Sequence, residues 1–257
     1  MGGELYQIAS IVAAGKLAMQ TGKPIVYTYA KYENSIRFVF LPRKAFFGTK
    51  KAAASNVSAW FAQLKSYGLQ DIKMLCPTSV KGRRSLGFSN KSDGLILCFF
   101  KDGRVTFFTA DWQFSTAKGQ WDILYTEQDW ENPPPGKPYF ENNTRSFRKA
   151  LSDIQDLANR IACESFVHFF NSAIRLLDGK DDYPDKIYGL ELPQIPRQHL
   201  PIFTAAAIAD VFGAMGSWND EPPGMAQERG LFEEYEAFSD ELLKNIRLAI
   251  LYAVNEW

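Results

Sequence analysis

The spacing of apolar residues predicts two helices in the first third of the chain. From residue 4 to residue 20 apolar side chains recur at helical spacing, and Gly22 and Pro24 follow as stop signals. A second helix is predicted over residues 51–67, where Gly68 follows as its end. Its apolar stripe consists of residues three and four positions apart, namely Val57, Trp60, Phe61 and Leu64.

Alternating apolar and polar residues predict about six strands in the same half of the chain. The clearest signal is the pair 95–101 and 104–110, which are joined by Asp102-Gly103, a dipeptide typical of type I′ turns. Successive short strands joined by turns favour a mainly antiparallel sheet. The other strands are predicted over residues 24–30, 36–40, 71–76 and 121–125, the first two forming a hairpin.

The pattern changes after a proline-rich segment at residues 132–138, which is predicted to be a semi-rigid linker. Beyond it the apolar residues follow helical periods only, and three such helices make a bundle. The sequence therefore predicts an α+β fold, in which a mainly antiparallel sheet with two helices is followed by a C-terminal helical bundle packed against it. The bundle helices are predicted over residues 143–179 (as one helix or two joined end to end), 199–215 and 230–255.

Charge is distributed unevenly between the two halves, although the net charge of the chain is zero. Residues 1–140 carry 18 Lys and Arg against 10 Asp and Glu, whereas residues 141–257 carry 11 against 19. We expect a basic α+β region, 1–140, and an acidic helical region, 141–257, that attract each other. The alternative is that the basic half contacts nucleic acid or a membrane.

The cysteines and the apolar segments favour a cytoplasmic protein without a membrane partner. Cys76, Cys98 and Cys163 are odd in number and lie in apolar surroundings, which predicts reduced core residues. No stretch approaches the 18 apolar residues that a membrane span needs, and the N-terminal segment lacks the features of a secretory signal.

The common motifs of nucleotide-binding proteins, hydrolases and zinc proteins are absent from the sequence, so we expect neither a cofactor nor a metal. Glu164 and His168 share a helix face, but a lone pair of this kind favours a hydrogen bond over a metal site. Asp181, Asp182 and Asp185 form an acidic loop without the spacing of a calcium site, which favours a solvated loop.

The most distinctive local feature is the segment Gly216-Ser-Trp-Asn-Asp220, which follows the small-residue apolar helix 199–215. Gly216 can end that helix with a positive φ, and Trp218 can pack back against it. The prediction we favour is a rigid corner between helices. The alternative is a binding cleft lined by Trp218, Asn219 and Asp220.

A second candidate is the basic segment between residues 81 and 91. Cations that surround an aromatic side chain can follow a phosphate backbone and stack a base, which makes this segment a candidate nucleic-acid site. The residues concerned are Lys81, Arg83, Arg84, Phe88 and Lys91.

The absence of chemical motifs, the opposed charges and the many aromatic residues favour a non-enzymatic protein that binds another macromolecule, most simply another protein. An immunity or accessory factor is an example of this class. The alternative is an enzyme or small-ligand protein with a cleft between the two halves, lined by the corner residues together with Tyr27 and Tyr29. Nucleic-acid binding through residues 81–91 is the third hypothesis.

Overall fold

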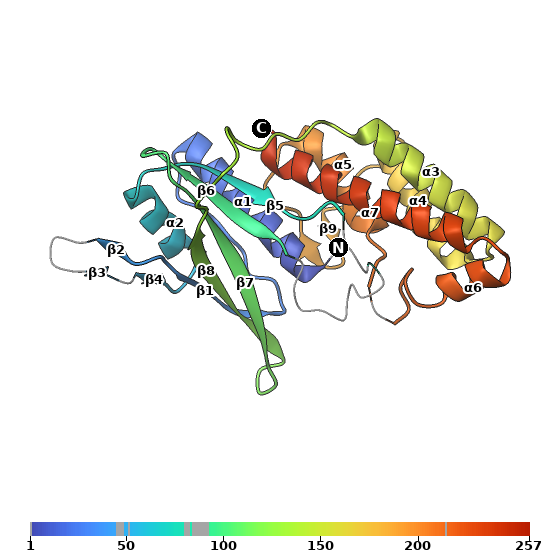
Figure 1. Ribbon diagram of the computed structural model, residues 1–257, viewed down its shortest axis with the longest axis horizontal. Helices are drawn as coiled ribbons and strands as arrows, with labels where there is room; N and C mark the ends of the chain where they lie inside the picture. The colour runs from blue at the N-terminus through green and yellow to red at the C-terminus, as the bar shows by residue number, and fades with distance from the viewer. Residues whose placement is uncertain (1, 45–48, 51, 80–82, 84–92, 214) are drawn as a thin grey trace. The chain divides into compact units, whose positions relative to one another are not determined.

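The structure is a computed structural model that describes residues 2–44, 49–50, 52–79, 83, 93–213 and 215–257 (Figure 1). It confirms the α+β class. Contacts divide the chain into two units: a sheet unit, Glu4–Leu75 and Lys91–Pro138, and a helical unit, Met1–Gly3, Cys76–Asn90 and Tyr139–Trp257. The division into regions 1–140 and 141–257 remains a prediction.

The sheet unit is built on a six-stranded sheet with the strand order β4-β1-β8-β7-β6-β5. All neighbouring pairs are antiparallel except β1 and β8, which run parallel. The strands are β1 (Glu33–Val39), β4 (Ala53–Ala54), β5 (Leu69–Leu75), β6 (Leu95–Phe100), β7 (Val105–Ser115) and β8 (Gln120–Asp129), and a separate pair consists of β2 (Arg43–Lys44) and β3 (Thr49–Lys50).

Two helices, α1 (Gly3–Thr21) and α2 (Val57–Ser66), supply apolar side chains to the core of the sheet unit. Gly15 of α1 lies next to β5, where a Cβ would be in ordinary contact, 3.4 Å from a side-chain carbon of Ile72. In α2, Trp60 is fully buried and stacks on Phe38 of β1 with ring centroids 4.7 Å apart. Asn56 caps α2, since its side chain accepts a hydrogen bond from the Ala59 amide at 2.8 Å.

The helical unit contains α3 (Thr144–Arg160), α4 (Glu164–Leu177), α5 (Leu200–Ala209), α6 (Pro222–Glu228) and α7 (Phe232–Asn255), with a 3₁₀ turn η2 (Arg197–His199) and the short strands β9 (Lys186–Ile187) and β10 (Leu190–Glu191). Helix α3 packs against α4 and α7, and α5 packs against the same two helices. The predicted helix 143–179 is thus two helices, separated at Ala162, which has a φ of +59°.

Four of the expected elements differ from the structure. The helix predicted over residues 51–67 begins only at Val57, and Ala53–Ala54 pair with β1 instead. Residues 24–30 form no strand, because Tyr27 and Ala30 donate hydrogen bonds to the Glu33 carboxylate instead of joining a ladder. The loop at Asp102-Gly103 is not a type I′ turn. Phe100 bonds to Arg104 across a three-residue loop in which only Gly103 has a positive φ, +84°.

The helix predicted over residues 199–215 ends at Ala209, so Gly216 does not end it. The chain turns back because the Val211 carbonyl accepts a hydrogen bond from the Trp218 amide at 3.0 Å. Gly216 still adopts a positive φ, +74°, within a turn. Its amide donates a hydrogen bond to the Asp220 carboxylate at 2.8 Å.

The proline-rich segment forms neither a helix nor a strand, as predicted, but it is held against the sheet unit. Lys73 of β5 donates a hydrogen bond to the Pro138 carbonyl at 2.8 Å, and Lys137 pairs with Asp71 at 2.7 Å. The Trp130 ring packs edge-on against Phe107 of β7. These contacts fix the path by which the chain leaves the sheet unit.

Candidate functional site

Two groups of residues that the sequence treats separately come together in the helical unit. Arg83, from the basic segment, donates a hydrogen bond to the Asn219 side chain at 2.8 Å, and the Asn219 amide donates one to the Arg83 carbonyl at 3.1 Å. The Arg83 guanidinium also pairs with Asp240 at 2.8 Å and with Glu236 at 3.3 Å, both on α7.

The charge of Arg83 is therefore neutralised inside the helical unit. Only 3% of the residue is exposed. Burial alone would lower the pKa of Arg83, but hydrogen bonds to Tyr235 and Asp240 raise it above its ordinary value. A guanidinium enclosed in this way has no surface to offer a phosphate, so this geometry gives the nucleic-acid hypothesis no support. Lys81, Arg84, Phe88 and Lys91 lie outside the described residues.

Trp218 is fully buried, with 0% of its surface exposed. Its ring packs edge-on against Phe166 and Phe170 of α4, and its indole N–H donates a hydrogen bond to Ser239 at 2.8 Å. The Trp218 carbonyl accepts a hydrogen bond from the Tyr235 hydroxyl at 2.7 Å. This geometry favours the rigid-corner interpretation, because no face of the indole is available to a ligand.

Tyr27 and Tyr29 belong to the sheet unit, where Tyr27 hydrogen-bonds to Glu33 at 2.9 Å and packs edge-on against Tyr29. Glu33 is 4% exposed and also accepts hydrogen bonds from Gln7 and from the Ala30 amide. Burial raises the pKa of Glu33, and the hydrogen bonds from Ala30, Gln7 and Tyr27 oppose this rise. Each set of predicted cleft residues is therefore engaged within its own unit.

Both histidines and one residue of the acidic loop make internal contacts. His168 packs against the ring of Phe169, and Asp181 forms an ion pair with Arg175 at 2.6 Å. The second histidine, His199, is buried, and its Nδ1 lies 3.1 Å from the Ala253 carbonyl. The three cysteines are buried and free of disulfides, as predicted.

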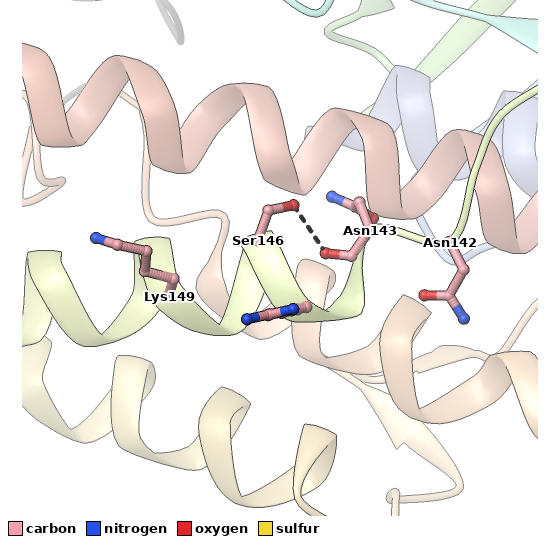
Figure 2. Close-up of a pocket in the computed structure, with 5 residues that line it drawn as sticks. Asn142, Asn143, Ser146 and Lys149 are labelled. Carbon is pink, nitrogen blue, oxygen red and sulfur yellow. Dashed lines mark hydrogen bonds between the residues drawn. The ribbon is translucent and has the colours of Figure 1, made fainter.

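A shallow cavity of about 390 Å³ lies at the start of α3 (Figure 2). The Ser146 hydroxyl donates a hydrogen bond to the Asn143 carbonyl at 3.1 Å, and Asn143 reaches the Asn245 carbonyl at 2.9 Å. Lys149 pairs with Asp153 one turn further along the helix. These polar groups are used to hold the first turn of α3, which makes the cavity a weak candidate. Its lining consists of Asn142, Asn143, Arg145, Ser146 and Lys149.

A further candidate, which the sequence did not indicate, is the outer edge of β7. Strands β7 and β8 pair over ten positions, from Thr106–Asp129 to Ser115–Gln120, and β1 pairs with the other side of β8 as far as the Glu33–Trp121 pair (Figure 1). Strand β6 covers the other side of β7 only as far as the Ile96–Phe108 pair. Within the described part of the chain, no strand pairs with β7 on that side beyond this point.

The hydrogen-bond pattern shows which groups of β7 face the open side. In an antiparallel ladder, residues bond alternately to one neighbour and to the other. Val105 accepts a hydrogen bond from Trp130, on the β8 side, and the Arg104 carbonyl accepts one from Phe100, on the β6 side. The backbone N–H and C=O groups of even-numbered β7 residues therefore point to the β6 side. Beyond the end of β6, those of Trp112 and Phe114 face outward.

Aromatic side chains accompany this open edge. Phe114 is 52% exposed and lies edge-on to Trp121 of β8, with ring centroids 5.1 Å apart. Trp121 in turn packs against Trp112, which packs against Tyr32. The indole N–H of Trp112 is enclosed without a hydrogen-bond partner among the described residues. The open backbone groups of such an edge can bind an extended peptide, and the aromatic rings beside it can pack against the side chains of that peptide.

Neither metal-site geometry nor similarity to other proteins assigns a chemistry to the chain. Among the described residues, no three His, Cys, Asp or Glu side chains are grouped so that they could hold a metal ion. None of the helices described is both long and apolar enough to cross a bilayer. No protein-family model, no curated protein and no solved structure matches the chain.

Proposed function

We propose that the protein binds another protein by accepting an extended segment of it as an additional strand along the outer edge of β7. The observation that carries this proposal is the pair of outward-facing backbone positions, Trp112 and Phe114, beyond the end of β6. A backbone hydrogen bond contributes a net of about 0.5–1.5 kcal/mol, so four such groups supply a useful share of a binding free energy.

The aromatic residues beside the edge support the same proposal. Strand addition takes its affinity from main-chain hydrogen bonds and its specificity from side chains that alternate between the two faces of the sheet. A partner residue on the face of Phe114 and Trp121 would cover the exposed ring of Phe114. Exposed aromatic surface next to unpaired backbone groups is typical of an interaction site.

A displayed library of random peptides tests the proposal. Phe114→Pro removes the outward N–H while leaving the ladder with β8 intact, because a proline is tolerated where the N–H faces outward. We expect peptides selected on the wild-type protein to bind Phe114→Pro at least about tenfold more weakly, which corresponds to about 1.4 kcal/mol.

Phe114→Thr is the matched control, because threonine keeps the N–H and the preference for a strand but removes the ring. We expect it to bind more tightly than Phe114→Pro and more weakly than the wild-type protein. Cooperative unfolding of both variants would show that they are folded. Selection of no peptide, or of peptides that bind Phe114→Pro as tightly as the wild-type protein, would refute the proposal.

A further inference from the structure

The end of the open edge that lies next to β6 opens into a cavity of about 600 Å³ within the sheet unit. Residues at the start of β6 form one wall, and residues of β7 and β8 form the other. The lining consists of Glu4, Asp93, Gly94, Leu95, Thr109, Ala110, Asp111, Thr126 and Gln128.

The backbone of Asp93 explains why the edge is open at this point. Asp93 has a φ of +55°, in the left-handed region, which an extended strand does not adopt. The chain therefore joins β6 only after this residue, and Trp112 and Phe114 are left without a neighbour among the described strands. Aspartate is one of the few residues that tolerate this conformation, and here its side chain lines the cavity.

The cavity is acidic. Among the described residues that line it, Glu4, Asp93 and Asp111 carry carboxylates, and none of the nine carries a positive charge. Asp111 is exposed and accepts a hydrogen bond from Gln113 at 3.0 Å. Grouped carboxylates repel one another, so a positive charge placed among them is favoured on electrostatic grounds.

Strand addition would bring a partner segment to this cavity. A strand laid beside Trp112 and Phe114 continues the line of β6, because it occupies the same side of β7. Its end next to Ala110 then lies against Gly94 and Asp93, which belong to the cavity wall. Side chains near that end enter the group of carboxylates.

From this arrangement we infer that the partner segment carries a lysine or arginine side chain at the end that lies next to Ala110. This inference rests on the proposed function and names the chemistry of its partner. The long apolar stem of such a side chain suits a cavity that also contains Leu95 and Ala110, while its charged end reaches Asp93 and Asp111.

The test compares selected peptides on two carboxylate variants. Asp111→Asn and Asp93→Asn remove one charge each, and asparagine also tolerates the left-handed conformation of Asp93. We expect peptides selected on the wild-type protein to be enriched in lysine or arginine at one position. Replacing that residue by methionine should weaken binding to the wild-type protein about fivefold or more.

The same replacement should have a much smaller effect on the Asp93→Asn/Asp111→Asn double variant, because the charge partner is gone. Asp129→Asn, which removes an exposed β8 carboxylate outside the cavity lining, is the control and should behave as wild type. Equal affinity of the basic and methionine peptides for the wild-type protein would overturn the inference. If those peptides still bound Phe114→Pro more weakly, the proposed function would stand.

Discussion

At the scale of single residues, the alternation of hydrogen bonds along β7 decides what a proline does. Gln113 lies on the ladder side facing β8, opposite Asp122, whereas Phe114 faces the open edge. We therefore expect Gln113→Pro to destabilise the sheet unit by about 1–3 kcal/mol, since it removes a ladder hydrogen bond and leaves its partner unsatisfied, and Phe114→Pro to cost much less.

Chemical denaturation of the two variants measures this difference. Equal destabilisation by both prolines would mean that the outward assignment of Trp112 and Phe114 is wrong. Both side chains are exposed, so the difference in burial is small beside the difference in hydrogen bonding.

Arg83 is a second residue whose surroundings set a clear expectation. Arg83→Met removes the hydrogen bonds to Asn219 and Asp240 and the ion pair with Glu236. We expect the free energy of unfolding of the helical unit to fall by about 2 kcal/mol or more. Chemical denaturation followed by the helical signal in circular dichroism measures this change.

Arg104→Met is the matched control, because its ion pair with Asp102 is largely exposed. Exposed pairs add little to stability, and we expect no measurable change. A loss of stability for Arg83→Met no larger than that for Arg104→Met would show that the contacts between Arg83 and α7 do not hold the helical unit together.

At the scale of elements, Gly15 lies where α1 packs on the sheet, and a methyl group at this position would still fit. A Cβ at this position would lie 3.4 Å from Ile72 and 3.5 Å from Phe61, which is ordinary van der Waals contact. Gly15→Ala should therefore stabilise the protein by about 0.5–1 kcal/mol through helix propensity. Gly15→Leu should destabilise it by about 1–3 kcal/mol, since the larger side chain overpacks this contact.

Thermal unfolding of the two variants distinguishes their effects. A lower midpoint for Gly15→Ala would mean that α1 and β5 approach more closely than the structure shows. A Gly15→Leu variant as stable as the wild-type protein would indicate that the helix can move away from Ile72 without loss.

Several elements could be predicted from the sequence because their signals are local. The periodic residues of α1, α3 and α7 face a core, and the hairpin of β6 and β7 has a glycine in its turn. Residues 24–30 were predicted wrongly because alternation does not show whether a strand has a partner. Tyr27 and Ala30 instead satisfy the carboxylate of Glu33.

The candidate site was less predictable, since it depends on where one strand stops beside another. The contact between Arg83 and Asn219 joins positions 136 apart in sequence, and no local pattern indicates it. The open edge arises because the chain joins β6 only after Asp93, while β7 runs on to Ser115. The aromatic residues between 112 and 121 could have indicated that β7 extends further, but the strand was predicted to end at Ala110.

At the scale of the whole molecule, the buried carboxyl of Glu33 gives stability a dependence on pH. Because burial raises its pKa, the folded protein binds this proton more tightly than the unfolded chain does. The contribution is fully present below the ordinary glutamate pKa of about 4.3 and is lost as the pH rises through the raised value.

Glu33→Gln removes this titration. We expect the free energy of unfolding of the wild-type protein, relative to that of Glu33→Gln, to fall as the pH rises from about 4.3 through the raised pKa of Glu33. Denaturant titrations of both proteins across this range measure the difference, and titrations common to the two cancel. A difference that stays constant or rises with pH would contradict the assignment.

An edge that is open to a partner is open to any other strand as well, so its side chains also act against unwanted assembly. Asp111 lies on the open stretch of β7, near the end of β6. Two copies aligned antiparallel about this residue would place like charges opposite each other, which disfavours that pairing. Asp111 therefore has the position of an aggregation gatekeeper, and its loss would favour fibrous or amorphous self-assembly at high concentration.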